Sequence, residues 1–201
     1  MTLPDYLKTS EKTHLIFDFD ETLIKLILPW EKAIEKIRKE LASLDETICK
    51  DYEQGKIPFS LLQNKYVSLF GKKALDLLIK NEIEFEKNCL EGVIVNKELI
   101  DFVKNLSGRE LLIWSSNTKP TINKFLRERK VFEKFKKIVS REDVKLLKPE
   151  IDGFNLLYDS KVSKKNYLFI GDSKFDRVAA KSAGIDFYFV DFFNAKGNIG
   201  N

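Results

Sequence analysis

Hydrophobic and polar positions change their period along the chain, and the change predicts two kinds of region. After about residue 96, short apolar runs alternate with stretches of helical period. One further apolar run lies near the N-terminus. Apolar runs separated by helices predict an α/β fold with a mostly parallel sheet covered by helices. The expected strands are 15–19, 110–115, 137–140, 167–171 and 186–190.

Two helices of the α/β region have clear boundaries. From Asn96, apolar residues recur at 99, 100, 103 and 106, and Gly108 follows as a stop signal. A second helix is expected over 174–183, ended by Gly184. This spacing places the apolar residues on one side of each helix, where they can cover a sheet.

Between residues 29 and 90 the period is helical and no strand is expected. Gly55 with Pro58, and Gly71, mark breaks between helices. The pattern therefore predicts a small helical bundle inserted after the first strand. Its three apolar stripes are Trp30, Ala33, Ile34, Ile37 and Leu41; Leu61, Leu62, Tyr66, Leu69 and Phe70; and Leu75, Leu78, Ile79 and Ile83.

The aromatic residues of this inserted region allow two interpretations. They could form the core of the bundle or line a substrate pocket, and the first is expected for most of them. The residues are Trp30, Tyr52, Phe59, Tyr66 and Phe70.

Composition narrows the function classes. The chain has 201 residues, 43% of them hydrophobic, which suits one domain with a substantial insertion. The net charge of +4 fits an enzyme for small anionic substrates. The basic residues near 36–39 and 134–137 are expected to be solvated, so no nucleic-acid partner is expected. Oligomeric state is not indicated.

The cellular context is expected to be the reducing cytoplasm. Cys49 and Cys89 are isolated and lack metal-site spacing. Residues 1–12 contain no apolar segment of the signal-peptide kind, and no stretch is long enough to span a membrane. His14, the only histidine, lies within an expected strand, which leaves little from which to build a histidine-based triad or a zinc site.

The strongest chemical signal is a pair of aspartates at the end of the first strand. In the stretch 14–23, an apolar run of strand type ends in Asp18 and Asp20. Side chains two apart on an extended segment point the same way, so the two carboxylates are expected to lie close together. Two buried anions need a cation or a proton to offset them. This arrangement indicates a site.

Other polar residues follow other strands. In an open parallel α/β sheet, ligands bind at the carboxyl ends of the strands. Asp18, Asp20 and Asp172 offer the oxygen ligands that Mg²⁺ prefers. A carboxylate can act as a nucleophile, while a hydroxyl and a lysine can bind phosphoryl oxygens. The residues are Ser115, Ser116 and Asn117; Lys148 before Pro149; and Asp172, with Asp176 one helical turn later.

These motifs, in this order, resemble those of the haloacid dehalogenase-like (HAD) hydrolase superfamily. The resemblance spans about residues 14–190. It implies a Rossmann-like parallel sheet of order 5-4-1-2-3, with the first strand central. It also implies a core formed by 1–27 and 97–201. The inserted region, 28–96, stands where the family carries a helical cap of the C1 type.

The resemblance also implies a Mg²⁺-dependent phosphatase acting on a small phosphorylated metabolite. Asp18 is then the nucleophile that forms an aspartyl-phosphate, and Asp20 is the acid and base. Asp20 also ligates Mg²⁺ through its carbonyl, and Asp172 completes the metal site. The remaining roles are Ser115, Ser116, Asn117 and Lys148 for phosphate binding, Lys148 also for catalysis, Thr22 for fixing Asp20, and Asp176 as an indirect metal partner.

Some choices within the motifs remain open. Either Ser115 or Ser116 can be the phosphate-binding hydroxyl, and the apolar run that ends at Trp114 favours Ser115. Lys145 competes with Lys148, but the following proline favours Lys148. Glu21 stands where many relatives carry glycine.

Alternative functions differ in what they require. A phosphoglucomutase-like phosphotransferase would use the same residues. A non-catalytic phosphate-binding protein on this fold has no feature in its favour, since every motif residue is present. A receiver domain of a signalling protein lacks the insertion after the first strand and the element that contains Asp172. The phosphatase is therefore the leading hypothesis.

Overall fold

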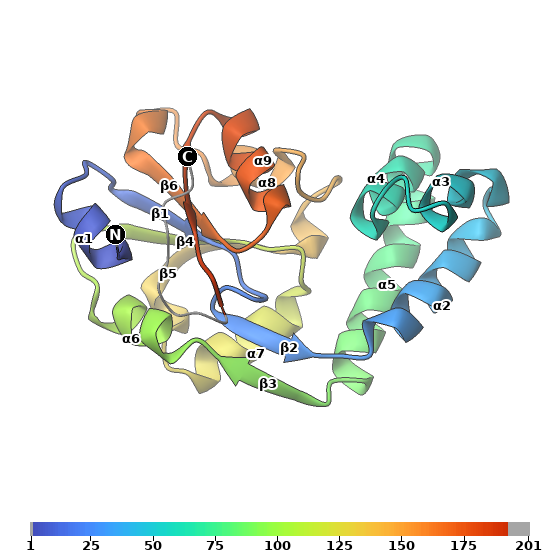
Figure 1. Cartoon of the computed structure of the whole chain (residues 1–201), viewed down its shortest axis with the longest axis horizontal. Coiled ribbons are helices and arrows are strands. Elements are labelled where there is room, and N and C mark those ends of the chain that lie inside the picture. The colour runs from blue at the N-terminus through green and yellow to red at the C-terminus, as the bar shows by residue number, and fades with distance from the viewer. Residues whose placement is uncertain (1, 193–201) are drawn as a thin grey trace.

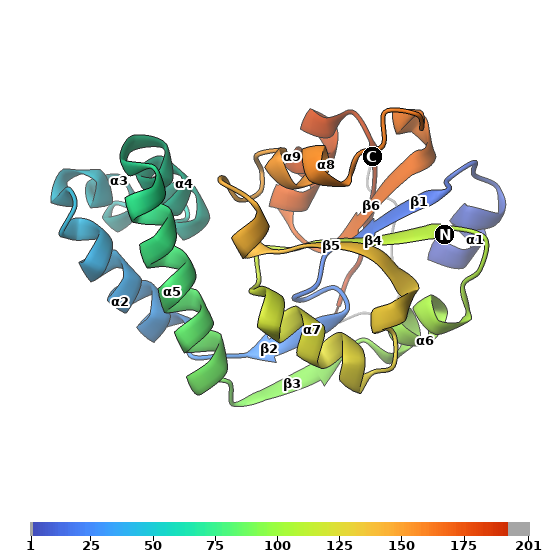
Figure 2. The ribbon, with the colours of Figure 1, turned by 180° about the vertical axis from the view of Figure 1, so that it is seen from behind.

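The computed structural model describes residues 2–192, so residues 1 and 193–201 of the expected core lie outside the described residues. Its centre is a parallel sheet in the order β5-β4-β1-β6-β7 (Figures 1 and 2). The expected order 5-4-1-2-3 numbers only the strands of this sheet, so that its strands 1 to 5 are β1, β4, β5, β6 and β7. Read from the β7 edge, the observed order is therefore the expected one, with β1 central. The strands are β1 (His14–Phe17), β4 (Glu110–Trp114), β5 (Phe135–Val139), β6 (Tyr167–Gly171) and β7 (Asp186–Phe189).

The sheet separates two apolar layers because successive side chains of a strand point to opposite faces. In β1, Leu15 and Phe17 pack into one layer and Ile16 into the other. The first layer is covered by α1 (Leu3–Lys8), α6 (Lys97–Asn105) and α7 (Lys119–Glu128), and the second by α8 (Asp152–Leu157) and α9 (Lys174–Ala183). All four residues of β1 are buried. This confirms an α/β fold with helices on both faces.

The expected helix boundaries agree with the observed capping. The Asn96 side chain accepts a hydrogen bond from Leu99 N at 3.1 Å, which caps α6, and Gly184 ends α9 with φ 73°. Among the described residues, no helix combines the length and apolar character that a membrane span requires. Short 3₁₀ segments occur at Glu46–Cys49, Phe132–Lys134, Arg141–Asp143 and Lys164–Asn166.

The region after the first strand is helical, as expected. We call residues 30–88 the helical insert. It has a hydrophobic cluster of its own that includes Leu41, Tyr66 and Leu78. Leu69 was expected on the buried stripe, but it is 62% exposed, because α4 buries Gln63 and Asn64 instead. The helices are α2 (Trp30–Ala42), α3 (Lys50–Glu53), α4 (Phe59–Phe70) and α5 (Lys72–Asn88).

A two-stranded antiparallel ribbon, which the sequence pattern did not predict, joins the insert to the core. It consists of β2 (Ile24–Ile27) and β3 (Gly92–Val95). Each strand has four residues, too few to show a clear alternation. The pairing brings the two ends of the insert together beside the sheet (Figure 1).

Candidate active site

The two aspartates after β1 are held by different partners. Asp18 is 7% exposed, and its Oδ1 accepts a hydrogen bond from Lys148 Nζ at 2.7 Å. Asp20 Oδ1 accepts from the backbone N of Leu26, in β2, at 2.7 Å. The ribbon therefore orients the Asp20 carboxylate, while a lysine 130 residues further along the chain holds Asp18.

Lys148 lies between two carboxylates in the interior. Its Nζ lies 2.6 Å from Asp176 Oδ1 and donates to Asp18 as well. Burial lowers the pKa of Lys148, but the nearby Asp176 and Asp18 more than offset this, so the pKa stays above its ordinary value. The competing Lys145 is exposed. The geometry thus brings Lys148, the favoured lysine, to the aspartates.

Asp172, at the end of β6, lies near the same centre. Asp18, Asp172 and Asp176 each place one carboxylate oxygen within 4.8 Å of the others. Asp176 is fully buried and is committed to Lys148 and to a capping box with Ser173. Thr22, expected to fix Asp20, instead donates its hydroxyl to Asp172 Oδ1 at 3.0 Å. Thr22 therefore orients Asp172.

Negative charge is only partly compensated here. Burial raises the pKa of Asp18 well above its ordinary value, against the effect of Lys148. Burial raises the pKa of Asp20 to about 7, and burial together with Asp176 raises that of Asp172 to about 6. Buried oxygen ligands with excess negative charge suit a hard divalent cation. The residues present therefore fit Mg²⁺.

In the loop after β4, the two adjacent serines have different surroundings. Ser115 is 2% exposed, and its hydroxyl donates to Asn117 Oδ1 at 2.9 Å, so it stabilises the loop internally. Ser116 and Asn117 line the cavity that also contains Asp18 and Lys148. The geometry thus favours Ser116 over Ser115, the residue that the sequence favoured. The apolar run before the loop did not reveal that the first serine turns inward.

The cavity lies between the core and the helical insert and has a volume of about 290 Å³. Asp18, Asp20, Asp172 and Lys148 line its core side. The insert contributes Trp30, Phe59, Ser60, Gln63, Glu82 and Glu86. Tyr66 is buried in the insert's own cluster, as expected for most of the aromatic residues, whereas Trp30 and Phe59 contact the cavity. Trp30 is 39% exposed.

Sequence reasoning missed the polar residues through which the insert contacts the core. Asn64 forms two hydrogen bonds with the backbone of Leu147, the residue before Lys148. Glu82 Oε2 lies 3.1 Å from Nε of the fully buried Arg141. Their signal was available but weak: on α5, polar residues at 81, 82 and 86 continue the spacing of the buried face begun at 74 and 78.

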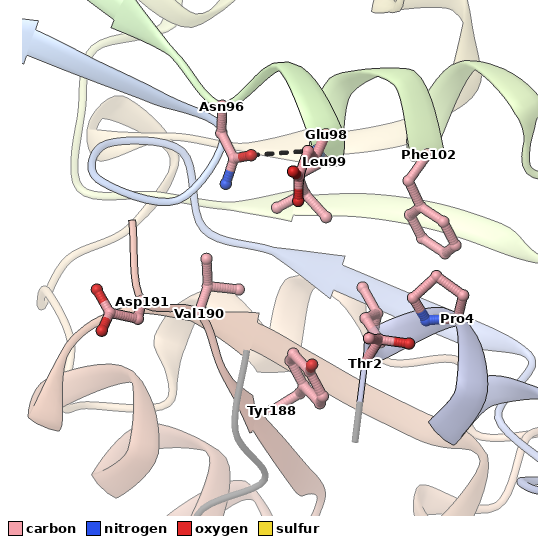
Figure 3. A pocket seen from close by; sticks show the side chains of 10 residues that line it. Thr2, Pro4, Asn96, Glu98, Leu99, Phe102, Tyr188, Val190 and Asp191 are labelled. Carbon is pink, nitrogen blue, oxygen red and sulfur yellow. Dashed lines mark hydrogen bonds between the residues drawn. The ribbon is translucent and has the colours of Figure 1, made fainter. Parts of the chain in front are cut away.

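A second pocket, of about 240 Å³, lies between α1, α6 and β7 (Figure 3). Its lining includes Leu99, Phe102, Tyr188 and Val190, and it contains no lysine or arginine among the lining residues that the structure describes. None of the residues expected in the site lines it. The motif residues therefore converge on the cavity beside the insert.

The sequence was compared with models of known protein families and with curated proteins. Residues 15–190 match the family model described as haloacid dehalogenase-like hydrolase. No match was found among curated proteins.

Solved structures share the fold. A Bacteroides fragilis protein named as a haloacid dehalogenase-like hydrolase is 20% identical, with TM-score 0.60, and the match covers 93% of this chain and 95% of that one. The magnesium-bound HAD-hydrolase YfnB of Bacillus subtilis is 22% identical, with TM-score 0.56 and coverage of 94% and 90%. A protein of Haemophilus somnus named as a predicted phosphoglycolate phosphatase is 19% identical, with TM-score 0.54 and coverage of 96% and 90%. At these identities the similarity concerns the fold alone.

Proposed function

The chain belongs to the haloacid dehalogenase-like hydrolases, and from that premise we propose that it is a Mg²⁺-dependent phosphatase of a small phosphorylated metabolite. The observation that carries the proposal is the convergence of Asp18, Lys148 and Asp172 at one cavity. Lys148 Nζ lies 2.7 Å from Asp18 Oδ1, and an oxygen of Asp172 lies within 4.8 Å of one of Asp18.

The proposed reaction has two displacements. A carboxylate oxygen of Asp18 attacks phosphorus, and the bond from phosphorus to the ester oxygen breaks. Asp20 gives its proton to the departing oxygen, which leaves as an alcohol. Asp20 then takes a proton from a water molecule that attacks the aspartyl-phosphate, which releases inorganic phosphate and restores Asp18.

Other side chains bind and orient the phosphoryl group. Ser116 donates a hydroxyl hydrogen bond to it, and Lys148 neutralises charge on it and on Asp18. Asp18, Asp172 and the backbone carbonyl of Asp20 would hold Mg²⁺, which supplies further neutralisation of the phosphoryl oxygens. Thr22 acts through Asp172, to which its hydroxyl donates a hydrogen bond. Asp176 acts through Lys148, from which it accepts one.

Residues 28–96, which contain the helical insert, are assigned the role of a C1-type cap, with 1–27 and 97–201 as the core. The side chains of the insert form one wall of the cavity. A wall of this kind excludes water from the reacting groups and contacts the organic part of the substrate.

The nucleophile is tested by Asp18→Asn. We expect hydrolysis of p-nitrophenyl phosphate with Mg²⁺ to fall to background, because an amide cannot form the aspartyl-phosphate. Phosphate release is the measurement, with circular dichroism as the check on folding. Asp101→Asn, at an exposed position of α6, is the control and should retain full activity. A folded Asp18→Asn protein with undiminished turnover would refute the assignment.

The acid and base role is tested by Asp20→Asn. p-Nitrophenolate leaves without much help from an acid, whereas an alkyl alkoxide needs a proton. We expect a burst of at most one equivalent of p-nitrophenolate, then slow turnover, and no burst with an alkyl phosphate. Stopped-flow absorbance measures the release of p-nitrophenolate, and a phosphate assay measures turnover of the alkyl phosphate. Wild-type turnover of the alkyl phosphate would contradict the role.

A further inference from the structure

Glu86 is a buried carboxylate of the insert that reaches into the core. It lies near the end of α5 and is 5% exposed. The backbone N of Thr118 donates to its two oxygens at 3.3 and 3.2 Å, and the Thr118 hydroxyl donates as well. Asn117 Nδ2 adds a further hydrogen bond at 3.2 Å. All these donors belong to the loop that follows β4.

The charge of Glu86 is held by hydrogen bonds from uncharged donors. Among the described residues, no lysine, arginine or histidine forms an ion pair with it, and burial raises its pKa against the effect of its hydrogen bonds. A buried carboxylate in such surroundings depends on its donors. Here they include the backbone N–H of Thr118, the residue directly before α7, and the N-terminal end of a helix favours an anion. Thr118 makes no side-chain cap of its own to α7, and its hydroxyl is used by Glu86.

We propose that Glu86 is a positioning residue for the phosphate-binding loop formed by Ser116, Asn117 and Thr118. The Asn117 side chain is held from both sides, since its Oδ1 accepts from Ser115 and its Nδ2 donates to Glu86. This fixes the backbone that presents Ser116 to the cavity. The loop is therefore complete only when the insert is seated on the core. The inference rests on the proposed phosphatase function.

Direct contact with the substrate is the competing role, because Glu86 also lines the cavity. The two roles differ in what a variant loses. A positioning residue affects every ligand that contains a phosphoryl group, inorganic phosphate included. A residue that contacts the leaving group affects only the esters whose leaving group reaches it.

The experiment compares Glu86→Ala and Glu86→Gln with wild type. It measures kcat/KM for p-nitrophenyl phosphate and for a small alkyl phosphate, and the affinity for inorganic phosphate by calorimetry with Mg²⁺. For Glu86→Ala we expect both kcat/KM values to fall by a similar factor, about 10- to 100-fold, with weaker phosphate binding. Glu86→Gln, which keeps the size and part of the acceptor capacity, should lose less. Glu84→Ala, exposed on the same helix, should match wild type.

A second pair of variants keeps the test decisive if Glu86→Ala folds poorly. Thr118→Val removes the hydroxyl partner and Thr118→Ser retains it. We expect Thr118→Val to reproduce part of the loss and to be non-additive with Glu86→Gln. Thr118→Ser, which keeps the hydroxyl, should avoid the loss seen with Thr118→Val.

Each other outcome overturns the inference in a distinct way. Unchanged phosphate affinity with loss for one ester alone assigns Glu86 to the leaving group. Wild-type values throughout, with hydrolysis intact, overturn the role of Glu86 but not the phosphatase function. A wild-type protein that neither hydrolyses the esters nor binds phosphate overturns both.

Discussion

Two groups of buried charges in this protein form ion pairs between distant parts of the chain. Lys148 forms ion pairs with both Asp18 and Asp176, and the buried Arg141 guanidinium faces Glu82. Removing one member of such a group leaves an uncompensated charge, which costs more than the pair contributes. The two lysine contacts serve the proposed chemistry. The contact between Arg141 and Glu82 joins the insert to the core.

The Glu82 carboxyl predicts a pH dependence of stability. Burial raises its pKa to about 7, against the effect of Arg141, from an ordinary value of 4.5. Between these values the folded state binds a proton that the unfolded state does not, so stability falls as pH rises through this range. The Glu82→Gln protein has no carboxyl at this position and so does not lose this stability as pH rises. The loss in wild type amounts to at most about 3 kcal/mol. We therefore expect the difference in Tm, variant minus wild type, to increase from pH 5 to pH 7.5.

Thermal unfolding monitored by circular dichroism across this pH range measures the effect of Glu82→Gln. The exposed Glu84→Gln is the matched control and should show a constant difference. A flat or falling difference for Glu82→Gln would mean that the carboxyl titrates near its ordinary pKa.

At the scale of elements, the β2–β3 ribbon connects the insert to the candidate site. Leu26 of β2 donates its backbone N–H to Asp20, and Asn96, which follows β3, donates its side-chain amide to the Thr22 carbonyl at 3.0 Å. The residues that carry the insert therefore also orient the acid expected in catalysis. A displacement of the ribbon would therefore move the Asp20 carboxylate.

The packing of α8 on the sheet depends on a glycine. A Cβ at Gly153 would lie 2.0 Å from Nε1 of Trp114, whose ring stacks on Phe169 at 5.0 Å between centroids. Gly153→Ala gains up to about 1 kcal/mol of helix propensity, but overpacking typically costs about 1–3 kcal/mol or more. At 2.0 Å from a ring that is itself packed, we expect the overpacking to win, with a net loss of about 2 kcal/mol and a lower Tm.

Chemical denaturation measures the change for Gly153→Ala. Gly92→Ala is a suitable control, because its Cβ would meet only Ile27 Cδ1, at an ordinary 3.6 Å. Equal stability of the Gly153→Ala protein and wild type would show that α8 shifts away from Trp114 without cost.

For the whole molecule, the charge of the cavity differs from that of the chain. The chain carries a net charge of +4, but Lys148 is the only cationic residue among the described residues that line the cavity. The carboxylates that line it are Asp18, Asp20, Glu21, Glu82, Glu86 and Asp172. The local field therefore opposes a second negative charge on the substrate, whatever the sign of the whole chain.

This charge distribution predicts discrimination between substrates. Of two alkyl phosphates of equal length, the one that ends in a carboxylate should have a kcat/KM about 10-fold below that of the one that ends in a hydroxyl. One tenfold step corresponds to about 1.4 kcal/mol, a modest repulsion between partly screened charges. The difference should narrow as salt is added. A phosphate-release assay at low and high ionic strength measures it, and a preference for the carboxylate would contradict the prediction.

The sequence by itself determined the parts of this protein that depend on neighbouring residues. Apolar runs of strand length gave the five sheet strands to within two residues at each end, and Gly184 marked the end of α9. The motif residues follow their strands directly, so the topology of a parallel sheet brings them to one edge. Pro149 distinguished Lys148 from Lys145 without any structure.

Only the tertiary structure decided which polar residues are buried and what they contact. Glu82 and Glu86 continue the spacing of the buried face of α5, but a charged side chain indicates a solvated position until α5 packs on the core. The ribbon pairs Ile24 with Val95, and no local pattern in two four-residue strands specifies that pairing. The inward turn of Ser115 depends likewise on its hydrogen bond to Asn117. Period and turn signals are local, whereas burial of a polar group requires partners that the fold supplies from distant segments.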